Sequence, residues 1–442
     1  MDRTASLRRR RWSLIATLLV FVLVGTCSSA GLGASASTGS KLSGSIVFLE
    51  RWPEPQYAPF WKKIVADYLA LHPNVRIDHQ AIADQPYKDK IRVLTAAGQL
   101  PDIYFSWAGD FANKFVRAGL AADLTPYMRN TPWGNSLAPA AVDAWTHGGK
   151  IYGVPISVDA KVFLYNTKIF ANNGLQVPKT IDALITTCDT LRSKGIEPIA
   201  FGNKDGWAAI HYMTSLNPKY VPRATLDKDF EPSTGEFTDP GYVAALNEFS
   251  MINKHCLTQG ANGIDYTVAQ AELMQGKAAM YYGQTVEFKT FTRAGGAPAS
   301  FANNWDFFPM PPVPNGRGDQ NLLTGAPDGF MINAKSKHID IAVDLLKFIT
   351  DRQNAEAFTK TLGRLSSVAG TATSANAFPQ LIKALRVINS ASGMNIWLDT
   401  ILHIDIANAY LNGLEAMLNG TKTPDQIMQD VRAAAAKVRA NP

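Results

Sequence analysis

Aromatic and acidic side chains follow several apolar segments of this chain, at the points where loops begin. A flat aromatic ring can cover the C–H face of a sugar ring, and planar polar groups bind paired hydroxyls through two hydrogen bonds. This combination suits a polyhydroxylated small molecule. The candidates in the first part of the chain are Trp52, Glu54, Asp84, Tyr87, Trp107 and Asp110.

A second set of such residues occurs further along the chain. Tyr281 and Tyr282 should point to opposite faces if they lie in a strand, so only one of them can face a site. Helix capping or core packing is the alternative role for every candidate, and Asp110 stands where an N-cap is expected. The second set is Trp207, Tyr212, Tyr282, Gln284, Glu287 and Trp397.

Motifs for known catalytic chemistry are absent from the sequence. There is no HExxH, GxSxG, CxxC or GxxxxGK[ST], and the seven histidines are scattered. We therefore expect no enzyme activity, metal or cofactor. A pair of carboxylates for sugar hydrolysis stays open, because spatial separation is what identifies it.

Strand and helix patterns alternate along the chain at intervals typical of βαβ units. The sequence predicts an α/β fold with a largely parallel sheet, followed by a predominantly helical end from Pro379. Residues 295–328, rich in Pro, Gly and Asn, read as a long surface connection or hinge. The predicted strands are 45–49, 75–81, 102–107, 161–165, 199–201, 278–282 and 330–333, and the predicted helices are 59–71, 87–97, 110–119, 180–194, 240–256, 266–275 and 339–351.

The N-terminus has the pattern of an export signal. Four arginines precede an apolar run from Leu14 to Val24, which is too short to span a bilayer. We predict a signal peptide over residues 1–36 and a tether over 37–44. Cleavage after Ala36 is one alternative and lipidation of Cys27 is the other. The protein is thus expected in the periplasm or at the outer face of the cytoplasmic membrane.

Charge and cysteine content narrow the class of protein further. Without residues 1–36, Lys plus Arg falls from 43 to 38 and Asp plus Glu from 37 to 36, leaving a net charge of +2. A net charge this small does not give the positive electrostatic potential that is expected of a nucleic-acid-binding protein. Cys188 and Cys256 can pair in an oxidising compartment, although sequence cannot show whether they come within reach. About 400 remaining residues indicate two domains.

Several segments, in order along the chain, resemble the carbohydrate-binding family of extracellular solute-binding proteins of bacterial ABC importers, which includes maltodextrin-binding proteins. Each segment is weak alone, but the ordered set is specific and covers nearly the whole chain after the signal. The chain departs from the family where its A-A-M strand is often followed by Gly-x-Trp, since Met280 precedes Tyr281-Tyr282-Gly283-Gln284. The segments are Thr95–Ile103 (TAAGQLPDI), Gly149–Pro155 (GKIYGVP), Leu164–Asn166, Gly174–Thr180, Gly276–Met280 (GKAAM) and Ser336–Ile349.

The resemblance implies a two-lobe periplasmic-binding-protein fold that closes on a ligand in the cleft. Chain crossings would lie near Val154–Val162, Gly325–Phe330 and Leu362–Ser367. The N-terminal lobe is then expected at 45–157 plus 328–362 and the C-terminal lobe at 158–327 plus 363–442. The crossing Gly325–Gly329 places Asp328 near the ligand. Arg364, in another crossing, is a candidate for binding a hydroxyl pair or a phosphate, with a surface salt bridge as its alternative.

The function that follows is the substrate-binding component of a carbohydrate ABC importer. A monomer would capture a sugar or sugar derivative and deliver it to a membrane permease, with ATP used by other subunits. Alternatives are a glycerophosphodiester-binding component of such an importer, a secreted carbohydrate-active enzyme, and an envelope interaction protein without a small ligand.

Overall fold

The computed structural model describes residues 42–441. The predicted signal peptide, Cys27 and most of the predicted tether lie outside the described residues. Among residues 42–441, no helix is long and apolar enough to cross a membrane. The described part contains two main sheets that define the two lobes; the first sheet has one hydrophobic core, and the second has a core on each face.

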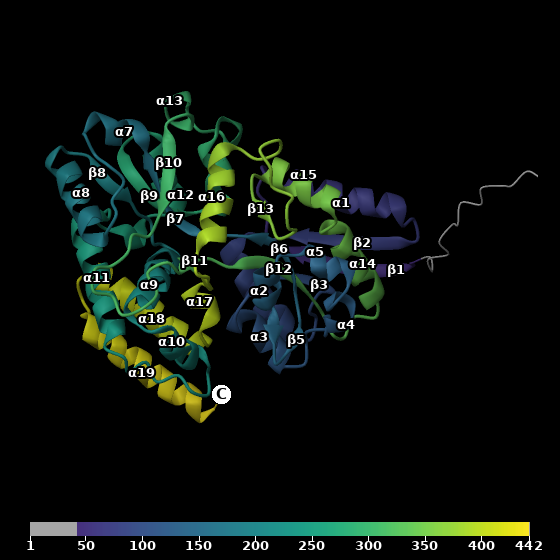
Figure 1. Ribbon diagram of the computed structural model, residues 1–442. Coiled ribbons are helices and arrows are strands. Elements are labelled where there is room, and N and C mark those ends of the chain that lie inside the picture. The colour runs from purple at the N-terminus through teal and green to yellow at the C-terminus, as the bar shows by residue number, and fades with distance from the viewer. Residues whose placement is uncertain (1–41, 442) are drawn as a thin grey trace, which may run out of the picture. The chain divides into compact units, whose positions relative to one another are not determined.

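The first lobe is built on a six-stranded mixed sheet (Figure 1). Its strands are β1 (Gly44–Glu50), β2 (Val75–Ala81), β3 (Ile103–Trp107), β6 (Val154–Val158), β12 (Pro327–Ile332) and β13 (Leu365–Ser366). Their order is β13-β6-β12-β3-β1-β2. β1 pairs in parallel with β2 and β3, whereas β12 runs antiparallel to both β3 and β6. A short hairpin joins β4 (Thr146–His147) to β5 (Lys150–Ile151).

Helices cover this sheet. They are α1 (Ala58–Leu71), α2 (Asp84–Ala96), α3 (Asp110–Arg117), α4 (Thr125–Met128), α5 (Pro132–Ser136), α6 (Pro139–Asp143), α14 (Ile339–Ile349) and α15 (Arg352–Leu362). α1 packs on β2, α14 and α15. Figure 1 shows α1 and α15 above the sheet and α2 and α3 below it. The aromatic core centres on Trp61, which stacks on Trp52 with ring centres 5.0 Å apart.

The second lobe is built on a four-stranded sheet of order β10-β7-β9-β8. Its strands are β7 (Lys161–Asn166), β8 (Glu197–Ala200), β9 (Ala278–Gln284) and β10 (Trp305–Pro309). β7 is antiparallel to β9 and β10, and β8 is parallel to β9. A parallel pair, β11 (Leu323–Thr324) with β14 (Met394–Asn395), lies apart from this sheet.

The remaining helices belong mostly to the second lobe. They are α7 (Thr167–Asn172), α8 (Ile181–Ser193), α9 (Trp207–Tyr220), α10 (Arg223–Phe230), α11 (Gly241–Cys256), α12 (Tyr266–Met274), α13 (Ala299–Ala302), α16 (Pro379–Ser390), α17 (Leu398–Ile401), α18 (Ile404–Leu418) and α19 (Pro424–Ala440), with 3-10 helices η1 (Ala261–Gly263), η2 (Thr285–Phe291) and η3 (Arg293–Gly295). Figure 1 shows α8 and α11 beside β8 and β9, and α19 along the lower edge.

Two chain crossings between the lobes touch each other. The link from β6 to β7 contains Asp159, and the link from β11 to β12 contains Gly325. A Cβ atom on Gly325 would lie 2.0 Å from the backbone oxygen of Asp159, so only glycine fits at this contact. The backbone of one crossing therefore lies directly against that of the other.

Three expectations about the fold need correction. The first-lobe sheet is mixed rather than largely parallel, because β12 returns from the second lobe and enters antiparallel between β3 and β6. Residues 295–328 are not one irregular connection, because they contain β10, whose Trp305 and Phe307 are buried. Finally, β13 follows the predicted boundary at residue 362 and yet pairs with β6 in the first sheet. The other boundaries remain predictions.

Candidate functional site

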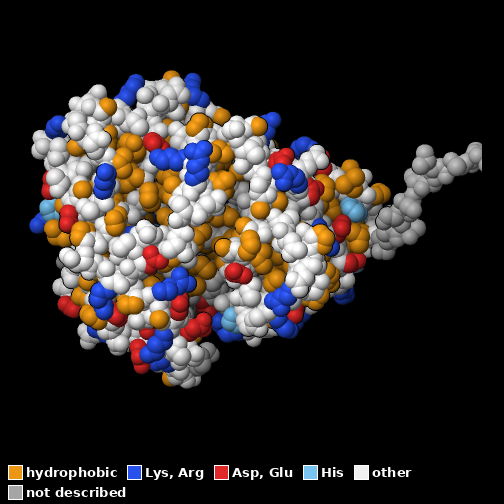
Figure 2. Space-filling view, viewed as in Figure 1, with side chains coloured by type: hydrophobic (Ala, Val, Ile, Leu, Met, Phe, Trp, Pro, Cys, Tyr) orange, Lys and Arg blue, Asp and Glu red, His pale blue; other side chains and the backbone are white. Residues whose placement is uncertain are grey.

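A cavity of about 430 Å³ is lined by residues from both lobes. Its volume falls in the lower part of the range of roughly 300–1,000 Å³ that small-molecule sites occupy. Figure 2 shows hydrophobic side chains among charged ones in the middle of the view, where the lobes meet. The lining comprises Arg51, Trp52, Glu54, Gln56, Tyr57, Asp84, Lys88, Trp107, Trp207, His211, Tyr266, Thr267, Gln270, Met274, Gln284, Val286, Glu287, Thr290, Arg364, Trp397, Asp399 and Thr400.

Arg51 organises the first-lobe wall, directly after β1. Its guanidinium carbon lies 5.3 Å from the ring centre of Trp52 and 5.4 Å from that of Trp107. Nη1 lies 3.5 Å from a carboxylate oxygen of Asp84, and Nη2 lies 3.4 Å from one of Asp328. The guanidinium thus links the ends of β1, β3 and β12 to the start of α2 and fixes the two indoles.

Arg364 brings a second guanidinium to the same wall. The left-handed Gly363, with φ of 64°, ends α15 and turns the chain so that Arg364 follows. Its guanidinium carbon lies 4.4 Å from the ring centre of Tyr57 and 5.5 Å from that of Trp52. The side chain is buried, and Nε and Nη1 have no hydrogen-bond partner among the described residues. These donors are free for a ligand.

The opposite wall begins with two aromatic residues one turn apart on α9. The rings of Trp207 and His211 have centres 5.3 Å apart, and His211 stacks on Trp397 at 4.4 Å. Burial lowers the pKa of His211 to about 4, so its imidazole is neutral at pH 7. Its Nε2 lies 3.5 Å from Asp399, whose other oxygen lies 3.8 Å from the ammonium of Lys88 on α2. The lobes are therefore linked by an ion pair at the edge of the cavity.

α12 adds a polar face to this wall. Tyr266, Gln270 and Met274 recur every four residues, so they lie along one side of the helix. The ring of Tyr266 meets that of Trp207 edge to face, with centres 5.1 Å apart. The wall therefore offers aromatic surface and an amide side by side.

Glu287 stands at the end of β9, where the chain turns into η2. Its carboxylate accepts a hydrogen bond from the backbone N–H of Gln284 at 2.7 Å and one from the Tyr281 hydroxyl at 3.4 Å. Burial raises the pKa of Glu287. This reciprocal cap, in which the Gln284 side chain also binds the first turn, fixes both side chains beside the cavity.

Unpaired polar atoms gather around the cavity in unusual number. Most buried polar atoms in folded proteins have a hydrogen-bond partner, because an unpaired one costs about 1–3 kcal/mol. Within residues 42–441, the cavity-lining atoms without such a partner are Arg51 Nε, Trp52 Nε1, Glu54 Oε2, His211 Nδ1, Arg364 Nε and Nη1, and Asp399 Oδ1. The site can therefore bind a ligand with several hydroxyls between aromatic faces. The described residues form no cluster of metal-ligating side chains.

The structure brings nine of the fourteen candidate residues to this cavity. They are Trp52, Glu54, Asp84, Trp107, Trp207, Gln284, Glu287, Arg364 and Trp397. Tyr87 is buried in the first-lobe core, where its hydroxyl donates to the backbone oxygen of Phe105. Asp110 lies elsewhere, in an ion pair with Arg117 on the same helix. Asp328 stands behind the lining, where it holds Arg51.

Tyr212 and Tyr282 do not line the cavity, because both belong to the core of the second lobe. Their rings pack with centres 4.5 Å apart. Tyr212 lies on the side of α9 that faces the sheet. Tyr282 points from β9 into the same core, and its hydroxyl contacts that of Ser215 at 2.5 Å.

Several lining residues were missed by the sequence reasoning. Arg51 directly precedes Trp52, so the same rule of residues after a strand points to it. His211 follows Trp207 by four residues, and helical spacing would have placed the two together. Lys88 and Asp399 pair across the lobes, and no local pattern signals such a contact. The other missed residues are Gln56, Tyr57, Tyr266, Thr267, Gln270, Met274, Val286, Thr290 and Thr400.

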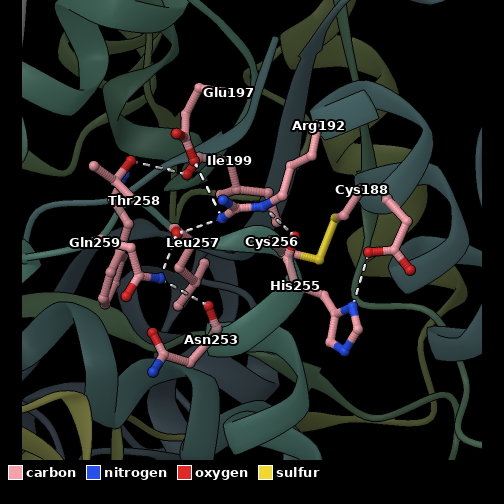
Figure 3. Close-up of polar contacts among 12 residues, drawn as sticks. Cys188, Arg192, Glu197, Ile199, Asn253, His255, Cys256, Leu257, Thr258 and Gln259 are labelled. Atoms are coloured by element: carbon pink, nitrogen blue, oxygen red, sulfur yellow. Dashed lines mark hydrogen bonds and ion pairs between the residues drawn. A yellow bond between two sulfur atoms is a disulfide. The ribbon is translucent and has the colours of Figure 1, made fainter. Parts of the chain in front are cut away.

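Cys188 and Cys256 form a disulfide in the structure, with Cα atoms 5.1 Å apart (Figure 3). The bond ties α8 to the end of α11, and both cysteines are fully buried. Beside it, Arg192 donates hydrogen bonds to the backbone oxygens of His255 at 2.6 Å and Leu257 at 2.8 Å. This junction lies in the second lobe, outside the cavity lining.

Comparisons with known proteins place this geometry in a family. A family model described as bacterial extracellular solute-binding protein matches residues 52–356. The chain belongs to this family. The solute-binding fold is shared by a structure described with xylan utilization by the thermophilic bacterium Caldanaerobius polysaccharolyticus, at 26% identity and a TM-score of 0.80, covering 88% of this chain and 99% of that one. A chitin oligosaccharide binding protein has the same fold, with 22% identity and a TM-score of 0.81, covering 90% of this chain and 100% of the other.

Relatives of this solute-binding protein are named for sugars. It is 25% identical over 60% of its length to the alpha-glucosides-binding periplasmic protein AglE of Rhizobium meliloti, of which 61% is covered. It is 30% identical to a maltotriose-binding protein of Pyrococcus abyssi over 32% of its own length and 29% of the relative's. The matched region thus spans less than two thirds of either relative.

Proposed function

We propose that this protein is the substrate-binding component of a carbohydrate importer, which captures a small saccharide in the cavity between its lobes. The observation that carries the proposal is the arrangement of that cavity. Trp107 on one side and Trp207 on the other supply aromatic surface, while the unpaired atoms of Arg364 supply hydroxyl partners. The sugars named for the relatives support the same class of ligand.

Binding without turnover accords with the family and the cavity. We propose that the ligand-loaded protein docks on an ABC permease, that ATP is used by other subunits, and that the protein works outside the cytoplasm as a monomer. Lobe closure about the crossings at Asp159 and Gly325 would bury the ligand. The lobe boundaries predicted from sequence, apart from the position of β13, belong to this proposal.

A panel of saccharides tests the ligand class. We expect at least one mono- or oligosaccharide to bind in a one-to-one complex by calorimetry and to be recovered unchanged. A saccharide that is hydrolysed would instead support the carbohydrate-active enzyme. If no saccharide binds, the carbohydrate proposal is wrong.

A second candidate ligand is a glycerophosphodiester, and Arg364 is the observation that favours it. The guanidinium of Arg364 is buried, and its Nε and Nη1 have no partner in the described chain, which suits a phosphate as well as a hydroxyl pair. Including glycerophosphocholine in the same panel separates the two ligand classes, because a protein that binds glycerophosphodiesters should bind it in preference to every neutral sugar.

Mass spectrometry of the exported N-terminus would decide between lipidation of Cys27 and cleavage after Ala36.

A further inference from the structure

A second cavity of about 280 Å³ lies in the second lobe and shares no lining residue with the first. Residues from β7, α9, β9, β10, α16 and the connection before β11 surround it. Part of its lining is apolar, from Phe308 and Met310 to Leu322 and Val387. It is a separate site and not a branch of the sugar cavity.

The charged side chains that line this second cavity are all basic. Lys161, Lys179 and Lys219 line it, whereas no aspartate or glutamate is among its lining residues. Lys161 is 1% exposed and Lys219 is 2% exposed. A buried ammonium is costly unless an anion or hydrogen-bond acceptors compensate it.

Lys161 is the less compensated of the two buried lysines. Its Nζ has no hydrogen-bond partner and no ion pair within the described chain, and lies 5.4 Å from the ring centre of Tyr282 and 5.1 Å from that of Trp207, which lines the first cavity. The acids that raise its pKa are Glu287, Asp159 and Asp399; none lines the second cavity, and Glu287 and Asp399 line the first. By contrast, Lys219 donates a hydrogen bond to the backbone oxygen of Gln320 at 2.8 Å. Burial lowers the pKa of Lys161 to about 8, which still leaves it mostly protonated at pH 7.

Hydroxyl groups complete the set of donors. Ser215 Oγ lies 2.5 Å from the Tyr282 hydroxyl and 2.6 Å from Thr324 Oγ1, and all three residues line the cavity. Ser215 Oγ also donates a hydrogen bond to the backbone oxygen of His211 at 3.1 Å, so an oxyanion would receive an O–H from Tyr282 or Thr324 in exchange for its contact with Ser215. Ammonium and hydroxyl donors therefore surround a space that is apolar on its other side.

We propose that the second cavity binds a small organic anion, with its carboxylate or phosphate oxygens at Lys161 and the hydroxyl cluster and its apolar part against Phe308, Met310 and Leu322. The apolar lining favours a ligand with a hydrocarbon body over a bare inorganic ion. Nothing in this inference depends on which solute the first cavity takes.

Calorimetry on the purified protein tests the proposal with benzoate, phenyl phosphate and the neutral analogue benzyl alcohol. We expect benzoate or phenyl phosphate to bind and benzyl alcohol not to bind. Comparing the affinities of benzoate and phenyl phosphate shows whether the cavity prefers a carboxylate or a phosphate. No binding of either anion at millimolar concentration would overturn the proposal, as would equal binding of benzyl alcohol.

Single substitutions test whether the anion binds in the second cavity. Lys161→Met should weaken anion binding roughly tenfold or more, because a charge-assisted contact is lost. Lys254→Met, which removes an exposed lysine of α11 outside both cavities, should leave it unchanged. Equal anion affinity in the wild type and Lys161→Met would show that the anion binds elsewhere and the proposal is wrong.

A variant at the rim of the cavity gives an independent test in case Lys161→Met does not fold. Val177 is 37% exposed and lines the cavity, so Val177→Trp should fold and block the cavity while leaving all three lysines in place. We expect Val177→Trp to lose anion binding and to keep saccharide binding. Retained anion binding in a folded Val177→Trp protein would contradict the proposed position.

Discussion

Arg364 carries a buried positive charge at the cavity with no ion-pair partner among the side chains that the structure describes. Its plane is covered by Tyr57 and Trp52, which leaves the guanidinium edge for hydrogen bonding. A two-point donor of this kind recognises adjacent hydroxyls or a phosphate. We therefore propose that Arg364 serves ligand recognition more than stability.

Arg364→Met should weaken binding of the solute about tenfold to hundredfold, the loss of one charge-assisted hydrogen bond or more. Titration calorimetry measures the change. The matched control is Arg352→Met at the start of α15, the helix that precedes Arg364, where the exposed guanidinium pairs with Glu356. Unchanged affinity in Arg364→Met would remove Arg364 from the binding site.

Asp159, in the crossing between the lobes, should make the free energy of unfolding depend on pH. Burial raises its pKa to about 7, although Oδ1 accepts hydrogen bonds from Thr285 and the backbone N–H of Val286. The folded protein therefore holds this proton more tightly than the unfolded chain. Its contribution to stability is present below about pH 4 and is lost progressively as the pH rises to about 7.

Asp159→Asn should abolish this loss, because the amide keeps the Oδ1 acceptor and cannot ionise. We expect the variant to match the wild type near pH 4 and to exceed it in free energy of unfolding at pH 8, by at most ~4 kcal/mol. Urea unfolding across this pH range measures the difference. If the two proteins lose stability in parallel between pH 4 and pH 7, Asp159 is not the group responsible.

At the scale of elements, the disulfide joins α8 to α11 across 68 residues of sequence. Closing a loop of that length in the unfolded chain stabilises the fold by about 4 kcal/mol in the chain-entropy model, and measured values are commonly 2–4 kcal/mol. Both cysteines lie in the core of the second lobe, away from the lining of either cavity.

The double variant Cys188→Ala, Cys256→Ala should lower the free energy of unfolding by about 2–4 kcal/mol. Solute affinity should stay within roughly twofold of the wild type, because neither cavity is touched. Denaturant unfolding and calorimetry measure these two quantities. Equal stability with and without a reducing agent in the wild type would show that the bond does not form or does not constrain the chain.

Sequence patterns located most elements because apolar periodicity and helix caps are local signals. The predicted helix 180–194 is an example: α8 begins after Thr180, whose side chain accepts a hydrogen bond from the backbone N–H of Ala183, and it ends before the left-handed Gly195. Strand direction is not local, so the antiparallel entry of β12 was missed. β10 was missed because Pro, Gly and Asn surround its five residues.

For the site, too, local sequence patterns predicted some residues, whereas contacts between distant residues could not be predicted. Trp52 and Trp107 both line the cavity, because Trp52 closely follows β1 and Trp107 ends the neighbouring β3. Tyr212 was placed wrongly, because the side of α9 that packs on the core depends on the sheet beneath it. The pairing of Lys88 with Asp399 joins residues from different lobes, and no spacing in a single sequence shows it.

At the scale of the whole molecule, two lobes linked by touching crossings can move as units. Lys88 and Asp399 already pair at 3.8 Å across the cavity, so the described arrangement brings both walls within reach of one ligand. Ligand bound by both lobes should favour the closed arrangement and stabilise the fold by linkage.

Bound solute should therefore raise the free energy of unfolding by about 2.7 kcal/mol at a concentration one hundred times Kd. Small-angle X-ray scattering should show a smaller radius of gyration in the loaded protein. Trp207→Ala removes one wall of the cavity and should weaken both effects at fixed ligand concentration. A radius unchanged by saturating solute would argue against closure.

Titration calorimetry against saccharides, with recovery of the ligand afterwards, tests the central claim most directly. We predict that one saccharide binds in a one-to-one complex, that Arg364→Met weakens this binding, and that the sugar is recovered intact. Hydrolysis of the sugar, or the absence of binding by every saccharide offered, would contradict the account.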